Sequence, residues 1–204
     1  MEAVMTPHIQ FRTDYWLTKE SIQPGGGYWL SFPVDATEAT YTVTGTPAYW
    51  GYPDPTYSFT MSVREVHVTT ANQGGDPAPV EHWVGASFYN TGTQPIVRWI
   101  TCMHSVTNAT FNRSSEVSTS MKLAAIHDRQ GSIITITAGS AESSPHPEIR
   151  PGQYYIEISS QEIAETLQED LGDEHIFKRL DEIMNNYRVD VGSGSFQAKL
   201  VEKP

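Results

Sequence analysis

The sequence predicts a mainly β protein, an antiparallel β-sandwich or barrel with one short C-terminal helical segment packed on it. Two observations lead to this fold class. Short apolar and β-branched segments recur along the chain, with turn-forming residues between them. Charged residues make up only 18% of the 204 residues, whereas Gly, Ser and Thr are abundant, a balance typical of all-β proteins. We expect a single β-rich domain, 1–204, and its abrupt start in strand-like sequence predicts a piece excised from a larger protein.

The strand candidates follow one another along the chain. Residues 10–34 repeat Tyr-Trp-Leu on either side of Pro24-Gly25-Gly26-Gly27, which predicts a hairpin-like pair of strands. Residues 56–70 alternate in polarity until the apolar phase slips at Arg64-Glu65, as a β-bulge would cause. Further strands are expected at 83–89, 96–103, 117–126, 132–138, 153–159 and 196–201.

One segment has helical rather than alternating spacing. It begins with Ser159-Ser160-Gln161-Glu162, a capping-box pattern, and apolar residues then recur on one face as far as Tyr187. We therefore expect a helical insertion at about 160–188, two short helices or one bent helix, before a closing strand. Its apolar stripe is interpreted as core, and its acidic face as solvated surface.

The charge balance excludes some partners. The formal net charge is −11, with no basic cluster longer than Lys178-Arg179, so phosphate backbones would be repelled and nucleic acid is not an expected partner. No stretch of 18 apolar residues exists, and membrane insertion is therefore not expected. The seven histidines show no chelating spacing, so no metal and no other cofactor are predicted.

Motifs for catalysis are also missing from the sequence. There is no phosphate-binding glycine loop and no Gly-x-Ser-x-Gly elbow, so we expect no enzyme and no catalytic residues. Two clusters nonetheless combine an imidazole with a carboxylate: Glu81-His82-Trp83, where a strand begins, and Pro145-His146-Pro147-Glu148, in a rigid loop. Polar loop ends are the simpler interpretation of both. A carbohydrate-active hydrolase with two facing carboxylates stays the alternative.

An aromatic stretch offers the strongest candidate for binding. Tyr49, Trp50 and Tyr52 are bracketed by Pro47 and Pro53, and rigid aromatic side chains lose little entropy when they contact a ligand. The competing interpretation is that these rings cover an edge of the sandwich. Together with His82 and Trp83, they form the predicted ligand-binding set.

These observations favour a non-enzymatic recognition domain. The expected type is a receptor- or glycan-binding projection, a spike or fibre module of a viral capsid, located at the virion surface and paired as a homodimer. A cytosolic lectin or a pore-forming defence protein, both cytoplasmic, is the further alternative. Asn108 and Asn112 match the glycosylation pattern, which matters only in a secretory compartment.

Overall fold

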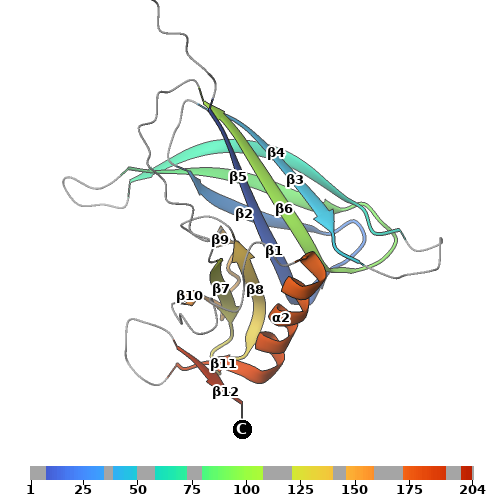
Figure 1. Cartoon of the computed structure of the whole chain (residues 1–204), viewed down its shortest axis with the longest axis vertical. Coiled ribbons are helices and arrows are strands. Elements are labelled where there is room, and N and C mark those ends of the chain that lie inside the picture. Colours follow the sequence, from blue (N-terminus) through green and yellow to red (C-terminus); the bar gives the residue numbers. More distant parts are fainter. Residues whose placement is uncertain are drawn as a thin grey trace, which may run out of the picture.

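The computed structural model describes residues 8–34, 39–49, 58–72, 80–107, 121–139, 146–158, 172–191 and 199–203. Within these residues the protein is mainly β, with antiparallel sheets that pack in a sandwich-like arrangement and one helix (Figure 1). The predicted fold class is confirmed. The prediction allowed a sandwich or a barrel. The described strands support the sandwich, because no sheet among them closes into a barrel.

The larger sheet has six strands in the order β10-β7-β8-β1-β6-β3. Its longest strand, β1, pairs with β6 on one side and β8 on the other, antiparallel in both cases. The strands are β1 (His8–Ile22), β3 (Ala39–Pro47), β6 (Ile96–Thr107), β7 (Lys122–His127), β8 (Ile133–Gly139) and β10 (Tyr154–Ile158).

The smaller sheet has four strands in the order β4-β5-β2-β9, again all antiparallel. The strands are β2 (Gly27–Val34), β4 (Met61–Asn72), β5 (Val80–Asn90) and the short β9 (His146–Pro147). The predicted β-bulge is confirmed, because the register between β4 and β5 shifts between Arg64 and His67.

An aromatic core fills the space between the two sheets. Trp16 of β1 stacks on Trp99 of β6 with ring centroids 5.8 Å apart, and Tyr28 of β2 meets Trp99 edge-on at 5.4 Å. Burial raises the pKa of the Tyr28 phenol to about 12. This core also contains a buried ion pair, in which the Arg12 Nε–H donates to Asp14 at 2.8 Å.

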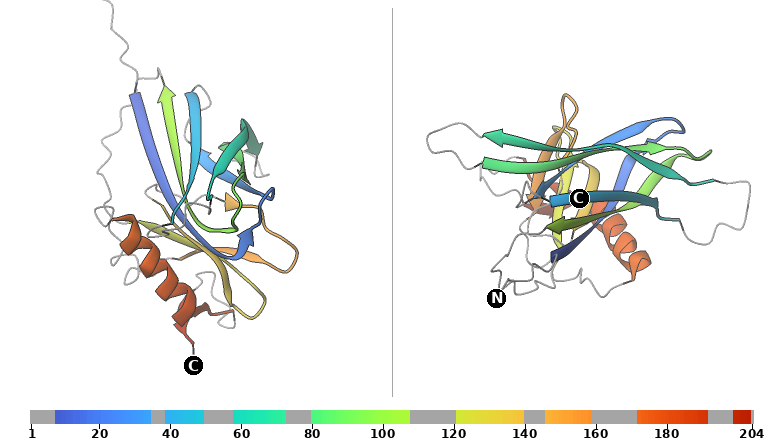
Figure 2. Two further views of the ribbon diagram at one scale, coloured as in Figure 1. Left: turned by 90° about the vertical axis from the view of Figure 1, so that its right-hand side faces the viewer. Right: turned by 90° about the horizontal axis from the view of Figure 1, so that it is seen from above.

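A second, mainly aliphatic core lies on the other face of the larger sheet, under helix α2 (Asp173–Asn186). Figure 2 shows the helix on the opposite side of the molecule from β4 and β5. The helix buries Ile176, Phe177, Leu180, Ile183 and Met184. This confirms the later half of the predicted helical segment, while residues 159–171 lie outside the described residues.

The end of the chain differs from its predicted role. Strand β12 (Leu200–Glu202) pairs with the short β11 (Tyr187–Val189) as a separate two-stranded sheet, so it does not close the sandwich. The Lys203 Nζ donates to the backbone carbonyls of Met184 and Asn185 at 2.9 and 2.8 Å. These contacts tie the described C-terminal residues to the end of α2.

The turn after β1 also differs from the prediction. Gly25 adopts a φ of 77°, which favours glycine, and the Gly26 N–H donates to the Gln23 carbonyl at 2.8 Å. The turn is therefore present, but it leads from the larger sheet into the smaller one. The expected hairpin is wrong, because β1 and β2 pair with other strands and face each other across the aromatic core.

Strand β3 was not anticipated from the sequence. Gly45, within it, lies so close to the other sheet that a Cβ there would be 2.7 Å from Met61 Sδ and 2.7 Å from Phe88 Cδ1. A glycine usually weakens a strand, and here it allows the edges of the two sheets to approach.

Candidate functional site

The outer face of the smaller sheet carries the candidate site. In β2, Leu30 and Phe32 point into the aromatic core, so the alternating positions Trp29 and Ser31 point outward. Both outward side chains are only half-buried. Among the described elements, helix α2 covers the larger sheet and not this face.

One row of residues crosses all four strands of this sheet in register. His67 of β4 is paired with Gly85 of β5, Gly85 with Ser31 of β2, and Ser31 with His146 of β9. Paired residues in neighbouring strands point to the same face. The row therefore has an imidazole at each end and two small residues in the middle.

The indole of Trp29 lies over the middle of this row. A Cβ on Gly85 would collide with Cζ2 of that indole and would come within 3.2 Å of Nε2 of His67. The centroids of the Trp29 and His67 rings are 5.0 Å apart. The Trp29 Nε1–H donates to the Ser31 hydroxyl at 3.2 Å. These contacts fix the indole against the sheet, and only a residue without a side chain fits beneath it.

A second group of rings continues from the other end of the row. Trp83 meets His146 edge-on with centroids 4.7 Å apart, and His146 meets Tyr155 of β10 at 4.5 Å. We call the five rings His67, Trp29, Trp83, His146 and Tyr155 the aromatic strip. The strip runs across the strands of the smaller sheet and reaches the edge of the larger one.

A shallow hollow opens beside the strip at its β9 end. Its lining combines rings with polar groups and consists of Trp29, Ser31, His146, Pro147 and Glu148. The Glu148 N–H donates to the Trp29 carbonyl at 3.2 Å, which continues the pairing of β9 with β2. Glu148 is exposed and borders the hollow together with His146 and Trp29.

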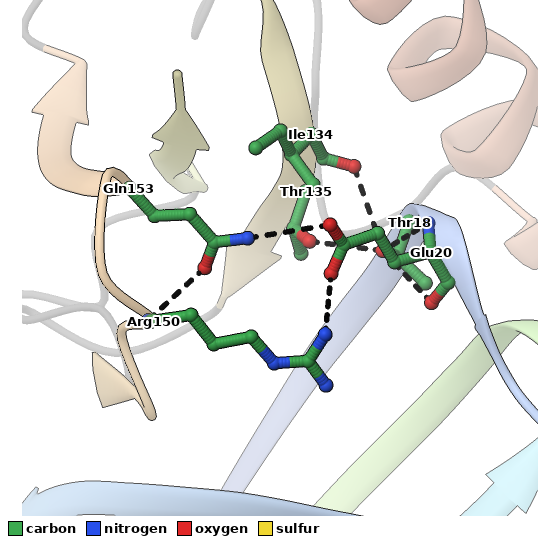
Figure 3. A network of polar contacts seen from close by, with 6 residues as sticks. All are labelled: Thr18, Glu20, Ile134, Thr135, Arg150 and Gln153. Carbon is green, nitrogen blue, oxygen red and sulfur yellow. Dashed lines mark hydrogen bonds and ion pairs between the residues drawn. The ribbon is translucent and has the colours of Figure 1, made fainter. Parts of the chain in front are cut away.

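A network of polar contacts holds the segment after β9 in place (Figure 3). The Glu20 carboxylate accepts from Arg150 at 2.9 Å and from Gln153 at 3.4 Å. Behind it, the buried hydroxyl of Thr135 donates to Thr18 at 3.0 Å. Since Glu20 and Thr18 belong to β1, this network joins the β9–β10 connection, and with it the hollow, to the central strand of the larger sheet.

The β-bulge shapes the β4 end of the strip. Glu65 has a φ of 56°, unusual for a residue other than glycine. Its carboxylate accepts from the Ser87 hydroxyl at 3.1 Å, and its carbonyl oxygen lies 3.0 Å from Nδ1 of His67. The guanidinium of Arg64 lies 5.0 Å from the centroid of the Tyr89 ring. Strained backbone of this kind concentrates at functional sites.

The structure separates the residues predicted to bind ligand. Trp83 belongs to the aromatic strip. Its neighbour His82 lies on the opposite face of β5, the face of the inward-pointing Val84, and is half-buried. The Tyr49 hydroxyl donates to the Pro95 carbonyl at 3.1 Å and accepts from the Val97 N–H at 2.8 Å. Its ring stacks on Phe59 at 3.8 Å. These contacts make Tyr49 part of the packing around β6, so its role in binding stays a prediction.

The other two predicted binding residues, Trp50 and Tyr52, lie outside the described residues, as do Asn108 and Asn112. The structure instead adds Trp29 and His67. The sequence contained a signal for Trp29, because alternation through Tyr28, Leu30 and Phe32 places it on the opposite face. A signal for His67 was present as well, because the apolar phase slips to Val66 and Val68 after the predicted bulge, which places His67 on the opposite face.

The strip combines several kinds of chemical group. It offers flat rings, hydroxyls, imidazoles and two carboxylates, those of Glu65 and Glu148. Among the residues that the structure describes, no three His, Cys, Asp or Glu side chains group as a metal site. In the same part of the chain, no helix has the length and apolar character to cross a bilayer.

Comparisons of the chain with protein-family models, with curated proteins and with solved structures find no match.

Proposed function

We propose that the protein is a non-enzymatic recognition domain that binds a glycan on the aromatic strip. The observation that carries this proposal is the indole of Trp29, held in place by its contact with Gly85 and its hydrogen bond to Ser31, and bordered by an imidazole and by Glu148. A rigid indole offers a large apolar surface at low entropic cost. The adjacent polar groups can bind sugar hydroxyls, whose positions distinguish one sugar from another.

Charge favours a sugar over a nucleic acid base as the stacking partner. Proteins that stack bases on aromatic rings also provide a basic groove for the phosphates. Here the net charge is −11, and carboxylates lie at both ends of the strip. An uncharged ligand avoids this repulsion.

The two carboxylates of the strip border an open sheet face. The Glu65 carboxylate accepts from the Ser87 hydroxyl of β5, which is two strand spacings or about 10 Å from the β9 end, where Glu148 lies. Glycosidases place their two carboxyl groups about 5 to 9.5 Å apart, facing each other across a cleft. The alternative hydrolase is therefore not favoured by these two acids.

Attachment to a cell-surface glycan is the biological role that we propose for this domain, as a projecting module of a capsid or fibre. Single glycan contacts are weak, and pairing of two copies would raise avidity. A homodimer belongs to this proposal, and sedimentation at micromolar concentration tests it. Monomers alone under those conditions would contradict the pairing.

The test of function is a glycan array probed with the intact protein and with Trp29→Ala. We expect specific binding that falls by about 2 kcal/mol or more in the variant, because an anchoring aromatic ring carries much of the binding energy. Val68→Thr is the matched control, since Val68 is 42% exposed on the same sheet but pairs with the inward-facing Val84. Equal binding by the wild type and Trp29→Ala would exclude the strip as the site.

A further inference from the structure

The two ends of the aromatic strip resemble each other chemically. At the β9 end, His146 and Glu148 border the hollow. At the β4 end, His67 lies beside Glu65, whose carboxylate accepts from Ser87 at 3.1 Å. Each end thus combines an imidazole with a carboxylate, and the indole of Trp29 lies between them.

We infer that the strip binds an extended, uncharged oligosaccharide that lies across the strands, with a second subsite formed by the exposed Glu65 and His67, where the buried Ser87 positions the Glu65 carboxylate. This inference rests on the proposed function and adds the ligand class, its minimum extent and its direction. The hollow at the β9 end would hold one part of the chain, and the β4 end another.

The extent of the strip supports a ligand longer than one sugar. From β9 to β4 the row crosses three strand spacings, about 14 Å, which exceeds the width of a single pyranose ring. His67, Gly85, Ser31 and His146 follow one another across this distance in register. A monosaccharide in the hollow would leave the β4 end without a contact.

The β-bulge supports a specific role for the β4 end. If the register set by Arg64 and Ser87 continued without a shift, Val66 would pair with Gly85 and His67 would point inward like Val84. The bulge instead pairs His67 with Gly85, which places an imidazole on the outer face where a valine would be. The strained φ of Glu65 accompanies this exchange. Bulges re-aim side chains at functional sites in this way.

The charges on the strip indicate an uncharged ligand. Hydroxyl groups donate strong hydrogen bonds to carboxylates, and a carboxylate is available near each end. Sulfated or carboxylated sugars would face these two acids and a net charge of −11. The Arg64 guanidinium, on the same face as Ser87, lies over the Tyr89 ring.

A length series tests the inference. Neutral oligosaccharides of the glucose, galactose, mannose and N-acetylglucosamine series, from monosaccharide to hexasaccharide, are titrated into the intact protein by calorimetry. We expect the affinity to rise on the order of tenfold or more between the monosaccharide and the tetrasaccharide, since each charge-assisted contact contributes roughly that factor. Acidic sugars of the same length should bind more weakly.

Variants at the two ends locate the ligand. Glu65→Gln and, independently, Ser87→Ala should lower the affinity for the tetrasaccharide on the order of tenfold and leave a monosaccharide unaffected. Glu148→Gln should weaken both ligands. Val68→Thr, on β4 but off the strip, is the control, and unchanged amide spectra in each variant show that the sheet is intact.

The outcomes separate this inference from the proposed function. Binding that Trp29→Ala abolishes but that does not grow with length, or that Glu65→Gln and Ser87→Ala leave unchanged, would overturn the extended path alone. Tighter binding of acidic than neutral sugars would overturn the ligand class. Absence of binding to every sugar, on the array and in the series, would overturn the proposed function itself.

Discussion

The tripeptide Tyr-Trp-Leu occurs twice in the chain, and its two copies have opposite environments. In β1, Trp16 is completely buried between the sheets, where it stacks on Trp99 and donates to the Thr101 hydroxyl at 3.1 Å. In β2, Trp29 points outward and its indole is half-buried in the aromatic strip. The same tripeptide thus places its tryptophan in the core in one strand and on a candidate binding surface in the other.

The difference arises from what covers each strand. β1 lies in the middle of the larger sheet, with the smaller sheet on one face and helix α2 on the other, so Tyr15 and Leu17 are buried as well. In β2 the inward positions are Tyr28 and Leu30, and the described elements leave its outer face bare. Trp29 therefore packs against the outer face of the sheet instead of in the core, and this exposure is the reason that it belongs to the proposed binding site.

Truncating the two tryptophans should give the largest contrast. Trp16→Ala deletes a fully buried indole and should lower the free energy of unfolding by about 3 to 5 kcal/mol. Trp29→Ala should lower it by about 1 kcal/mol, because the ring is partly exposed. Urea denaturation of both variants measures these values. Similar losses in the two variants would show that Trp29 also belongs to the core.

A second effect is expected at alkaline pH and concerns Tyr28, the inward-facing neighbour of Trp29. Burial raises the pKa of Tyr28 from 10.0 to about 12, so the folded protein retains a proton that the unfolded chain releases near pH 10. The stability that Tyr28 contributes is complete below pH 10 and is lost as the pH rises through 12, up to about 3 kcal/mol.

Urea midpoints between pH 9 and 12 measure this effect, with Tyr28→Phe as the comparison. The decline in stability with pH should be less steep in Tyr28→Phe than in the wild type. Identical slopes would show that Tyr28 titrates at its ordinary pKa.

Gly85→Ala tests whether ligand binding depends on the position of the Trp29 ring. The added methyl would collide with the Trp29 indole while the aromatic core behind the sheet is unchanged. We expect binding to weaken by about 1 to 2 kcal/mol, because the ring leaves its fixed position. Glycan titration and tryptophan fluorescence report the two effects, and an unchanged affinity would mean that this position of the indole is not required.

The smallest effect is expected at the network of Figure 3. Glu20 and Arg150 have side chains that are 49% and 64% exposed, and exposed ion pairs contribute about 0 to 1 kcal/mol. Glu20→Gln should therefore change stability by less than about 1 kcal/mol in urea denaturation. A larger loss would show that the β9–β10 connection is a stabilising element rather than only a support for the hollow.

The fold class could be predicted because alternation and turn residues are local signals. The apolar phase of β4 even revealed its bulge at Arg64-Glu65. The hairpin at Pro24-Gly27 was predicted wrongly for a physical reason: turn chemistry determines that the chain reverses, whereas packing across the core determines which sheet the next strand joins. Strand β3 was missed because Gly45, unfavourable within a strand, is explained only by the contact with Met61 and Phe88.

The candidate site was less predictable because it is assembled across strands. Trp83 and His146 belong to two clusters recognised in the sequence, and their contact at 4.7 Å depends on β5 and β9 both flanking β2. Such pairing carries no local signal. The row His67, Gly85, Ser31 and His146 comes from four separate strands, so no spacing within one segment could reveal it.

The central place of β1 has a consequence for synthesis on the ribosome. β1, the longest of the described strands, is made before its partners β6 and β8, which end at Thr107 and Gly139. At about 5 to 20 residues per second, both of its edges wait on the order of ten seconds for their partners. During that interval an unpaired strand containing Tyr15, Trp16 and Leu17 is a target for aggregation, so yield in a cell should depend on chaperones that bind the nascent chain.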